Sequence, residues 1–232
     1  MKLFDAHHHL WNLQVLEYKW LKQIGVPKPF GDPTPIQKDY LTKNFLNDVA
    51  EAADIELAGS VHIQVDGALF DPVTETSWLS KPDPSGIPSA IVGFVNLTKE
   101  DAEAVLKRHL SFPKFRGVRQ IIGMLEQRPD LSFTSEHLLR NPQWQENFVL
   151  LEKHQLSFEL QLYPEQMTES ADFLSGFPEV PVVIDHAGCP YDQSESGLQL
   201  WREGLASLAE LPNLHIKLSG FGMYDKDWSS GS

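Results

Sequence analysis

Two histidines near the start of the chain, His7 and His9, are spaced to act together on one group. They lie in the sequence Asp-Ala-His-His-His-Leu-Trp at residues 5–11, directly after a short apolar run. On an extended strand, residues two apart project to the same side, so His8 faces the opposite side. Two such imidazoles can hold a metal ion or polarise a carbonyl. Because apolar residues flank the triplet, a functional site is favoured over an expression tag or a pair of purely structural histidines.

The composition limits the kind of protein that carries this site. With 232 residues, 41% of them hydrophobic, the chain can bury a sizeable core, and we expect one domain over residues 1–232. The formal net charge of −13 disfavours nucleic-acid and anionic-membrane partners. The single Cys189, the lack of a signal-peptide pattern and the lack of a run of about 20 apolar residues predict a cytoplasmic protein.

Short apolar runs alternate with helical patterns along the chain. Residues 10–40 are rich in proline and tryptophan, which predicts a long loop covering the mouth of the fold, either as a structural cover or in contact with substrate. Strands are predicted at the N-terminus and over 59–66, 90–96, 115–121, 156–163, 180–186 and 214–219. Helices are predicted over 44–58, 99–110, 165–175 and 198–210, and one or two helices over 136–154, broken near Asn141-Pro142. This alternation indicates a parallel α/β sheet.

The side-chain pattern within the predicted strands favours a barrel over an open sheet. In the second strand, Val61, Ile63 and Val65 alternate with His62, Gln64 and Asp66. Strands 156–163 and 214–219 show the same split into an apolar and a polar face. An open sheet covered on both sides would be apolar on both faces, whereas a barrel buries one face under helices and turns the other inward. We therefore predict a TIM (β/α)8 barrel with functional groups at the carboxyl ends of its strands.

Six short motifs resemble those of the amidohydrolase superfamily, in the same order. They are Asp-x-His-x-His at 5–9, Glu-Thr-x-Trp-Leu at 75–79, Arg-Gly-Val-Arg at 116–119, Leu-Gln-x-Tyr-Pro at 160–164, Val-Ile-Asp-His-Ala-Gly at 183–188 and Lys-Leu-Ser-Gly at 217–220. Within that superfamily the chain is similar to the sugar-acid lactonases and the 2-pyrone-4,6-dicarboxylate lactonase. The resemblance implies a TIM-barrel hydrolase of carbohydrate catabolism that opens a lactone ring with water.

The resemblance also implies roles for individual residues. His7, His9 and His186 would be catalytic, either as ligands of a divalent metal, zinc in the first instance, or by polarising the lactone carbonyl without a metal. Arg119 would bind a carboxylate or hydroxyl of the substrate, and the further substrate-binding candidates are Gln161, Lys217 and Trp11. Ester hydrolysis needs an electrophilic clamp for the developing oxyanion, which agrees with these roles.

Several polar residues have a structural alternative. Lys217 could form an internal ion pair with Glu159 or another inward acid. His62 is expected to be a hydrogen-bonded residue of the barrel interior. Asp185 alternates with His186 and is expected to face away from it as a structural residue. The helical patterns around His109, His137 and His154 predict surface positions.

The chain departs from the family pattern at two places. Strand 156–163 offers Glu159 and Gln161 where relatives with a firmly held metal have a histidine, and no acidic eighth-strand motif precedes Ser232, so we expect the last βα unit to be missing. Two other functions stay open: a decarboxylase acting on a small unsaturated acid with the same histidines, and a catalytically inactive barrel. The expected partner is a small lactone or carboxylate, and a homo-oligomer is also open.

Overall fold

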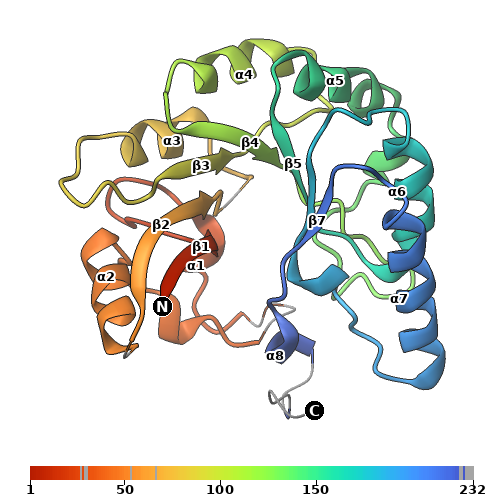
Figure 1. Cartoon of the computed structure of the whole chain (residues 1–232), viewed down its shortest axis with the longest axis horizontal. Coiled ribbons are helices and arrows are strands. Elements are labelled where there is room, and N and C mark those ends of the chain that lie inside the picture. The colour runs from red at the N-terminus through yellow and green to blue at the C-terminus, as the bar shows by residue number, and fades with distance from the viewer. Residues whose placement is uncertain (27, 29–30, 53, 66, 225–226, 228–232) are drawn as a thin grey trace. The chain divides into compact units, whose positions relative to one another are not determined.

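The chain folds into two compact units in the computed structural model. Figure 1 labels its helices and strands. The first unit comprises Met1–Val26, Asp32–Asn96 and Glu103–Arg119, and the second comprises Pro27–Gly31, Leu97–Ala102 and Gln120–Ser232. The structure describes all residues except 27, 29–30, 53, 66, 225–226 and 228–232. The predictions that involve Pro27, Pro29, Ala53 and Asp66 therefore fall outside the described residues, and the single domain stays a prediction.

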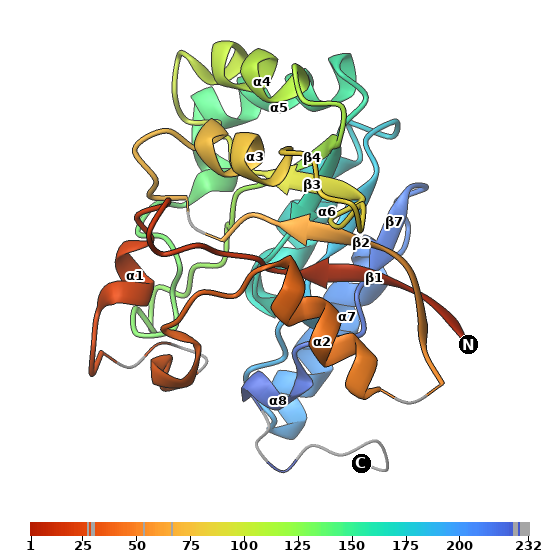
Figure 2. The ribbon, with the colours of Figure 1, turned by 90° about the vertical axis from the view of Figure 1, so that its left-hand side faces the viewer.

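The described part of the first unit contains a parallel sheet of four strands. These are β1 (Lys2–His8), β2 (Glu56–Ile63), β3 (Ala90–Gly93) and β4 (Phe115–Arg119), and each pairs with the next one in the sequence. Parallel neighbours need a crossover connection, and here these contain α2 (Thr42–Glu51), α3 (Val73–Leu79) and α4 (Ala102–Leu110). Figure 2 shows α3 lying beside β3.

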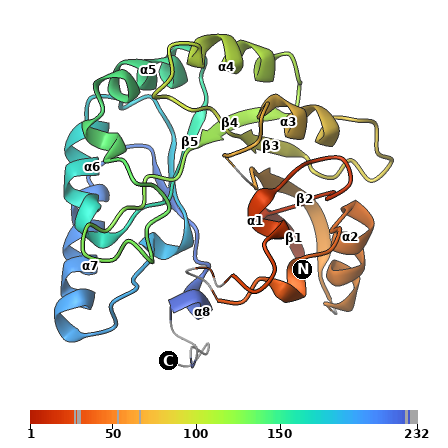
Figure 3. The same ribbon diagram turned by 180° about the vertical axis from the view of Figure 1, so that it is seen from behind.

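The described part of the second unit repeats this pattern with three strands. They are β5 (Ser157–Leu160), β6 (Val182–Ile184) and β7 (Leu214–Ile216), again paired in parallel in chain order. Helices η2 (Leu138–Arg140) and α5 (Pro142–Lys153) precede β5, and α8 (Phe221–Tyr224) follows β7. The connecting helices are η3 (Pro164–Gln166), α6 (Met167–Leu174), η4 (His186–Gly188) and α7 (Glu195–Leu208). Helices α6 and α7 pack side by side (Figure 3).

The segment after β1 is an ordered structure with a small core of its own. It contains two short helices, α1 (Lys19–Lys22) and η1 (Thr34–Ile36). Trp11, Leu16, Tyr18 and Leu21 are buried together in one cluster. As the dense prolines indicated, the described residues of this segment form short helices only, and the aromatic residues pack them in place. Its expected position over a barrel mouth stays a prediction.

The predicted strands all exist but end earlier than expected, because the ladder hydrogen bonds stop before the apolar pattern does. The prediction that the apolar face of β7 lies under helices is wrong for two residues. Ile216 is 40% exposed, and Leu218 just beyond the strand is 79% exposed. An alternating pattern identifies an apolar face but does not supply the element that covers it. None of the helices formed by the described residues is long and apolar enough to cross a membrane.

Candidate active site

The alternation predicted for residues 7–9 is confirmed. His7 Nε2 and His9 Nε2 lie 3.2 Å apart, with their rings edge to face at a centroid distance of 4.9 Å. His8 points away from this pair: its Nε2 lies 2.9 Å from Ser60 Oγ and its ring stacks on Phe45 of α2. The imidazoles of His7 and His9 therefore meet at one point at the end of β1, and the imidazole of His8 packs against α2.

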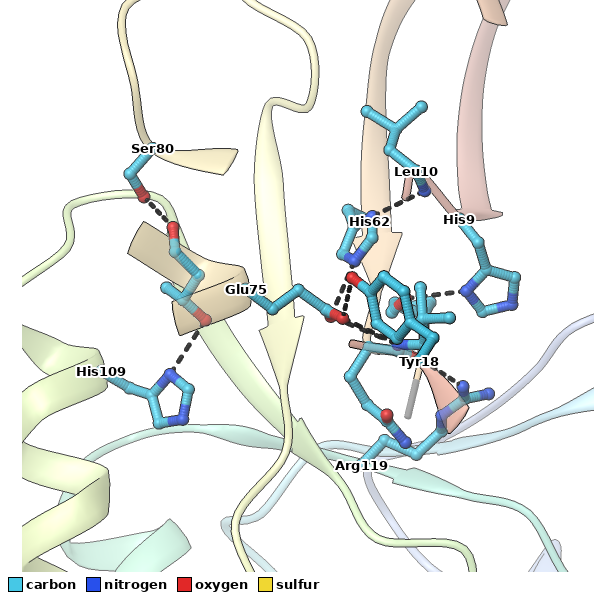
Figure 4. Close-up of polar contacts among 12 residues, drawn as sticks. His9, Leu10, Tyr18, His62, Glu75, Ser80, His109 and Arg119 are labelled. Carbon is cyan, nitrogen blue, oxygen red and sulfur yellow. Dashed lines mark hydrogen bonds and ion pairs between the residues drawn. The ribbon is translucent and has the colours of Figure 1, made fainter. Parts of the chain in front are cut away.

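A backbone carbonyl selects the tautomer of His9. Its Nδ1–H donates to Ile63 O at 2.7 Å (Figure 4), and since a carbonyl can only accept, the proton must be on Nδ1. The Nε2 atom then carries a lone pair, which faces His7 Nε2 in this structure and could instead meet an electrophile. Burial is the main cause that lowers the pKa of His9 well below its usual range, with the nearby charges of His7 and Arg119 acting in the same direction. His9 is therefore a neutral imidazole, the form that binds metals or polarises carbonyls.

The spacing of the pair fits two ligands of one divalent cation. Two imidazole nitrogens bound tetrahedrally at the usual zinc distance of about 2.05 Å would be about 3.3 Å apart. His7 and His9 match this with 3.2 Å between their Nε2 atoms. Within the part of the chain that the structure describes, no group of three or more histidines, cysteines or acids is arranged to hold a metal ion. The two histidines thus make up a partial ligand set.

Arg119 belongs to the same unit as the histidine pair. It ends β4, is only 4% exposed, and its Nη2 donates to Gln64 O. Gln64 is itself held by a hydrogen bond from its N–H to Val92 O on β3, 2.8 Å long. The structure therefore brings His7, His9 and Arg119 together in the first unit, on the ends of β1 and β4.

Trp11 is fixed by the chain around it. Its indole N–H donates to Lys38 O, and its backbone forms a two-way bridge with Tyr40, with N···O distances of 2.9 and 3.0 Å. These contacts close the loop formed by residues 12–39. They account for the burial of Trp11 structurally, and its contact with substrate stays a prediction.

A second set of predicted residues lies in the second unit. Lys217 Nζ donates to Glu159 Oε2 and lies 3.2 Å from Asp185 Oδ1, so one ammonium group serves two buried carboxylates. The alternative that Lys217 pairs with Glu159 is thus confirmed. Burial and the charge of Asp185 raise the pKa of Glu159 above its usual range, although Lys217 opposes the shift. Gln161, also buried, accepts from Ile122 N–H at 3.1 Å through its backbone carbonyl.

His186 sits in an unusual turn at the end of β6. Residues His186, Ala187, Gly188 and Cys189 all have positive φ, between 52° and 74°. His186 Nδ1 lies 3.1 Å from Ser219 Oγ, and Ala187 N–H donates to Lys217 O at 2.9 Å, which ties the turn to the end of β7. His186 belongs to the second unit and His7 and His9 to the first, so their convergence on one metal or carbonyl stays a prediction.

Sequence reasoning quoted Glu75 in the 75–79 motif but gave it no role, and the structure shows it as a buried carboxylate on α3. His62 Nε2–H donates to its Oε1 at 3.0 Å, and Tyr18 O–H donates to its Oε2 at 2.8 Å (Figure 4). The prediction that His62 is a hydrogen-bonded interior residue is confirmed. The sequence pattern could have indicated that Glu75 is buried. It lies among Val73, Thr76 and Leu79, the apolar or small residues that form the buried face of this helix.

The predicted surface position of His109 is wrong. His109 is fully buried on α4, where Thr76 Oγ1 lies 2.9 Å from its Nδ1 and its Nε2–H donates to Phe94 O at 3.1 Å. Its ring stacks on Phe115. The spacing of Ala102, Leu106 and His109 places all three on one helix face, which is the buried one. His137 and His154 are half-buried rather than fully exposed.

Comparisons with known proteins agree with this fold. The chain belongs to the amidohydrolase family, whose model, described as Amidohydrolase, matches residues 4–231. It is 35% identical over 231 residues to Uncharacterized protein y4mH of Sinorhizobium fredii, covering 99% of this chain and 76% of that protein. It is 27% identical over 219 residues to the L-fucono-1,5-lactonase of Burkholderia ambifaria, covering 93% of this chain and 67% of the lactonase.

A solved structure also matches. The crystal structure of an amidohydrolase from Burkholderia multivorans with bound zinc aligns with a TM-score of 0.71 and 22% identity, covering 96% of this chain and 71% of that one. This likeness shows the fold. The predicted family and the TIM-barrel class are therefore confirmed. The described residues form seven strands that alternate with helices.

Proposed function

We propose that this chain hydrolyses a lactone, of the sugar-acid or pyrone-dicarboxylate type, through attack of water on a carbonyl polarised at His7 and His9. The observation that carries the proposal is the pair of Nε2 atoms 3.2 Å apart, one of them set by Ile63 O to expose its lone pair. An ester carbonyl gains negative charge on oxygen as water attacks, and an electrophile at this point stabilises that charge. The lactonase relatives support the choice of a cyclic ester as substrate.

His7 and His9 would hold a divalent metal, and His186 is the third ligand that we propose. Zinc suits imidazole ligands, and when bound it would supply Lewis acidity to the substrate carbonyl. The zinc-bound amidohydrolase structure supports this choice of metal. The neutral state of His9, which its burial favours, leaves a lone pair for the ion at neutral pH.

The chain's other predicted residues would bind and orient the substrate. Arg119 carries a fixed charge in the same unit as the histidine pair, and a guanidinium recognises a carboxylate or hydroxyl through paired N–H donors. Gln161, Lys217 and Trp11 are proposed to contact the remainder of the ring. Lys217 would do so while neutralising Glu159 and Asp185.

The test is a panel of sugar-acid lactones and 2-pyrone-4,6-dicarboxylate, followed by proton release with a pH indicator. In ¹⁸O-labelled water, hydrolysis must place one labelled oxygen in the product carboxylate. We expect turnover of at least one lactone, reduced at least about 100-fold in His7→Ala, as for loss of an oxyanion stabiliser. Release of carbon dioxide from an unsaturated acid with no lactone opened would favour the decarboxylase, and no turnover of either kind would favour an inactive barrel.

A further inference from the structure

Glu75 joins the end of β2 to the segment ahead of α1, which lies 57 residues before it in the sequence. Its carboxylate accepts hydrogen bonds from His62 on β2, from Tyr18 ahead of α1, and from the backbone N–H of Val65 at 3.2 Å. The side chain is 4% exposed, and His62 and Tyr18 are fully buried. A buried carboxylate with three donors is well satisfied, and its removal would leave all three donors without this acceptor.

The segment that Glu75 holds is also the one that positions two site residues. Ile63 O accepts from His9, Gln64 O accepts from Arg119, and Val65 N–H donates to Glu75. Three consecutive residues at the end of β2, Ile63 to Val65, therefore fix His9, fix Arg119 and attach to the carboxylate, in that order. Any movement of Val65 is transmitted to the acceptors of both side chains across one or two peptide units.

His62 also links the Glu75 carboxylate to the backbone next to His9, through a hydrogen bond with Leu10. Leu10 N–H donates to His62 Nδ1 at 3.1 Å, so Nδ1 has no proton and the ring proton is on Nε2, where it meets Glu75 (Figure 4). Leu10 directly follows His9. The backbone of His9 is thus held through His62, and its imidazole is held through Ile63 O.

We propose that Glu75 is a positioning residue that sets the orientation and tautomer of His9, acting through His62 and the backbone of residues 63–65. This inference rests on the proposed role of the His7–His9 pair. Tyr18, in the 12–39 segment, also donates to the Glu75 carboxylate. The position of Tyr18 is therefore linked through Glu75 to the orientation of His9. Partners that orient a ligating histidine commonly affect metal affinity or activity by about 10- to 100-fold.

The experiment reads the histidine tautomers directly by long-range ¹H–¹⁵N correlation NMR of the ring nitrogens. In the unmodified chain we expect His9 protonated at Nδ1 and His62 at Nε2. Glu75→Ala should give a mixture of tautomers at His9 and weaken Zn²⁺ binding at least about 10-fold. Glu75→Gln should restore most of both, because its amide oxygen still accepts from His62 and Val65 while its NH₂ can donate to the Tyr18 hydroxyl.

The matched control is Glu103→Ala, since Glu103 also lies in the first turn of a helix of this unit but pairs with exposed Lys107. It should leave both tautomers and zinc binding unchanged. If Glu75→Ala does not fold, Tyr18→Phe, which removes one of the three donors, should still shift the His9 ring signals. An unchanged His9 tautomer and zinc affinity in a folded Glu75→Ala protein, or unchanged His9 ring signals in the Tyr18→Phe protein, would overturn the proposal. The NMR readout needs no substrate, so a failed lactonase assay does not affect it.

Discussion

Lys217 and Glu159 form a buried ion pair although 58 residues separate them in the sequence. Lys217 follows β7 and Glu159 lies on β5, and Asp185 at the end of β6 completes the group at 3.2 Å from the same ammonium. Three neighbouring parallel strands thus place one cation between two acids. The substrate-binding role predicted for Lys217 has to coexist with this task.

The first prediction concerns this ion cluster. Lys217→Met should lower the free energy of unfolding by roughly 3–5 kcal/mol, because it leaves Glu159 and Asp185 buried without their cation. Burial raises the pKa of Glu159 in the folded state to about 8, above its unfolded value, so at low pH the folded state keeps a proton there that stabilises it. As the pH rises this proton is lost, and the bare carboxylate needs the Lys217 cation. The loss on removing Lys217 should therefore grow with pH. Denaturant unfolding at several pH values measures this.

Glu159→Gln is the matched variant for that measurement. It keeps the Lys217–Asp185 pair and removes the excess negative charge, so it should cost about 1 kcal/mol or less. Equal losses for Lys217→Met and Glu159→Gln would show that the cluster is not held by charge.

The second prediction concerns the histidine pair. His9→Ala should lower kcat/KM for the lactone at least about 100-fold, because it removes one of the two imidazoles proposed to polarise the carbonyl. The far-UV circular dichroism spectrum and cooperative unfolding should be retained, because His9 lies just beyond the end of β1. His109 cannot serve as the control, since it is buried and bonded to Thr76. The exposed His215 on β7 is suitable, and His215→Ala should leave kcat/KM within about twofold. Full turnover by His9→Ala would remove this pair from the mechanism.

The third prediction concerns His109 and acid stability. Burial lowers the pKa of His109 from 6.5 to about 4, so the folded protein keeps the ring neutral where the unfolded chain protonates it. Its contribution is complete above pH 6.5 and is lost as the pH falls towards 4, a change of about 3 kcal/mol from this shift alone. His109→Gln should flatten the stability curve between these pH values. His215→Gln, at an exposed position, should not alter it.

The fourth prediction concerns the turn that holds His186. Gly220 has φ +76°, and a Cβ there would lie 2.6 Å from His186 Cβ. Gly220→Ala should therefore destabilise the chain by more than the roughly 1–2 kcal/mol of a left-handed alanine and displace the His186 ring. Gly25→Ala isolates the backbone cost, because Gly25 has φ +71° and no atom within 4 Å of its Cβ position. Equal unfolding free energies for the two variants would contradict the close approach.

The sequence alone determined the family, the alternation of strands and helices, and the pairing of His7 with His9 across His8. These follow from local rules, since a strand's period of two and the order of six motifs do not depend on distant residues. The same rules indicated that His62 is bonded in the interior, and they offered an ion pair of Lys217 with Glu159 or another inward acid as an alternative to substrate binding. They overestimated the lengths of strands β3 to β7, because an apolar pattern continues past the last ladder hydrogen bond, and they placed β2 three residues too late.

Only the tertiary structure decided which groups complete the site. The tautomer of His9 depends on Ile63 O, 54 residues away, and the tautomer of His62 on Leu10 N–H, 52 residues away. Glu75 acquired its importance from three donors on two separate segments, Tyr18 and residues 62–65, and the partners of His109 are Thr76 on α3 and the Phe94 carbonyl after β3. Sequence periodicity reports which face of an element is apolar. Hydrogen-bond partners and protonation states depend on which strand ends and helices meet, and folding alone brings those together.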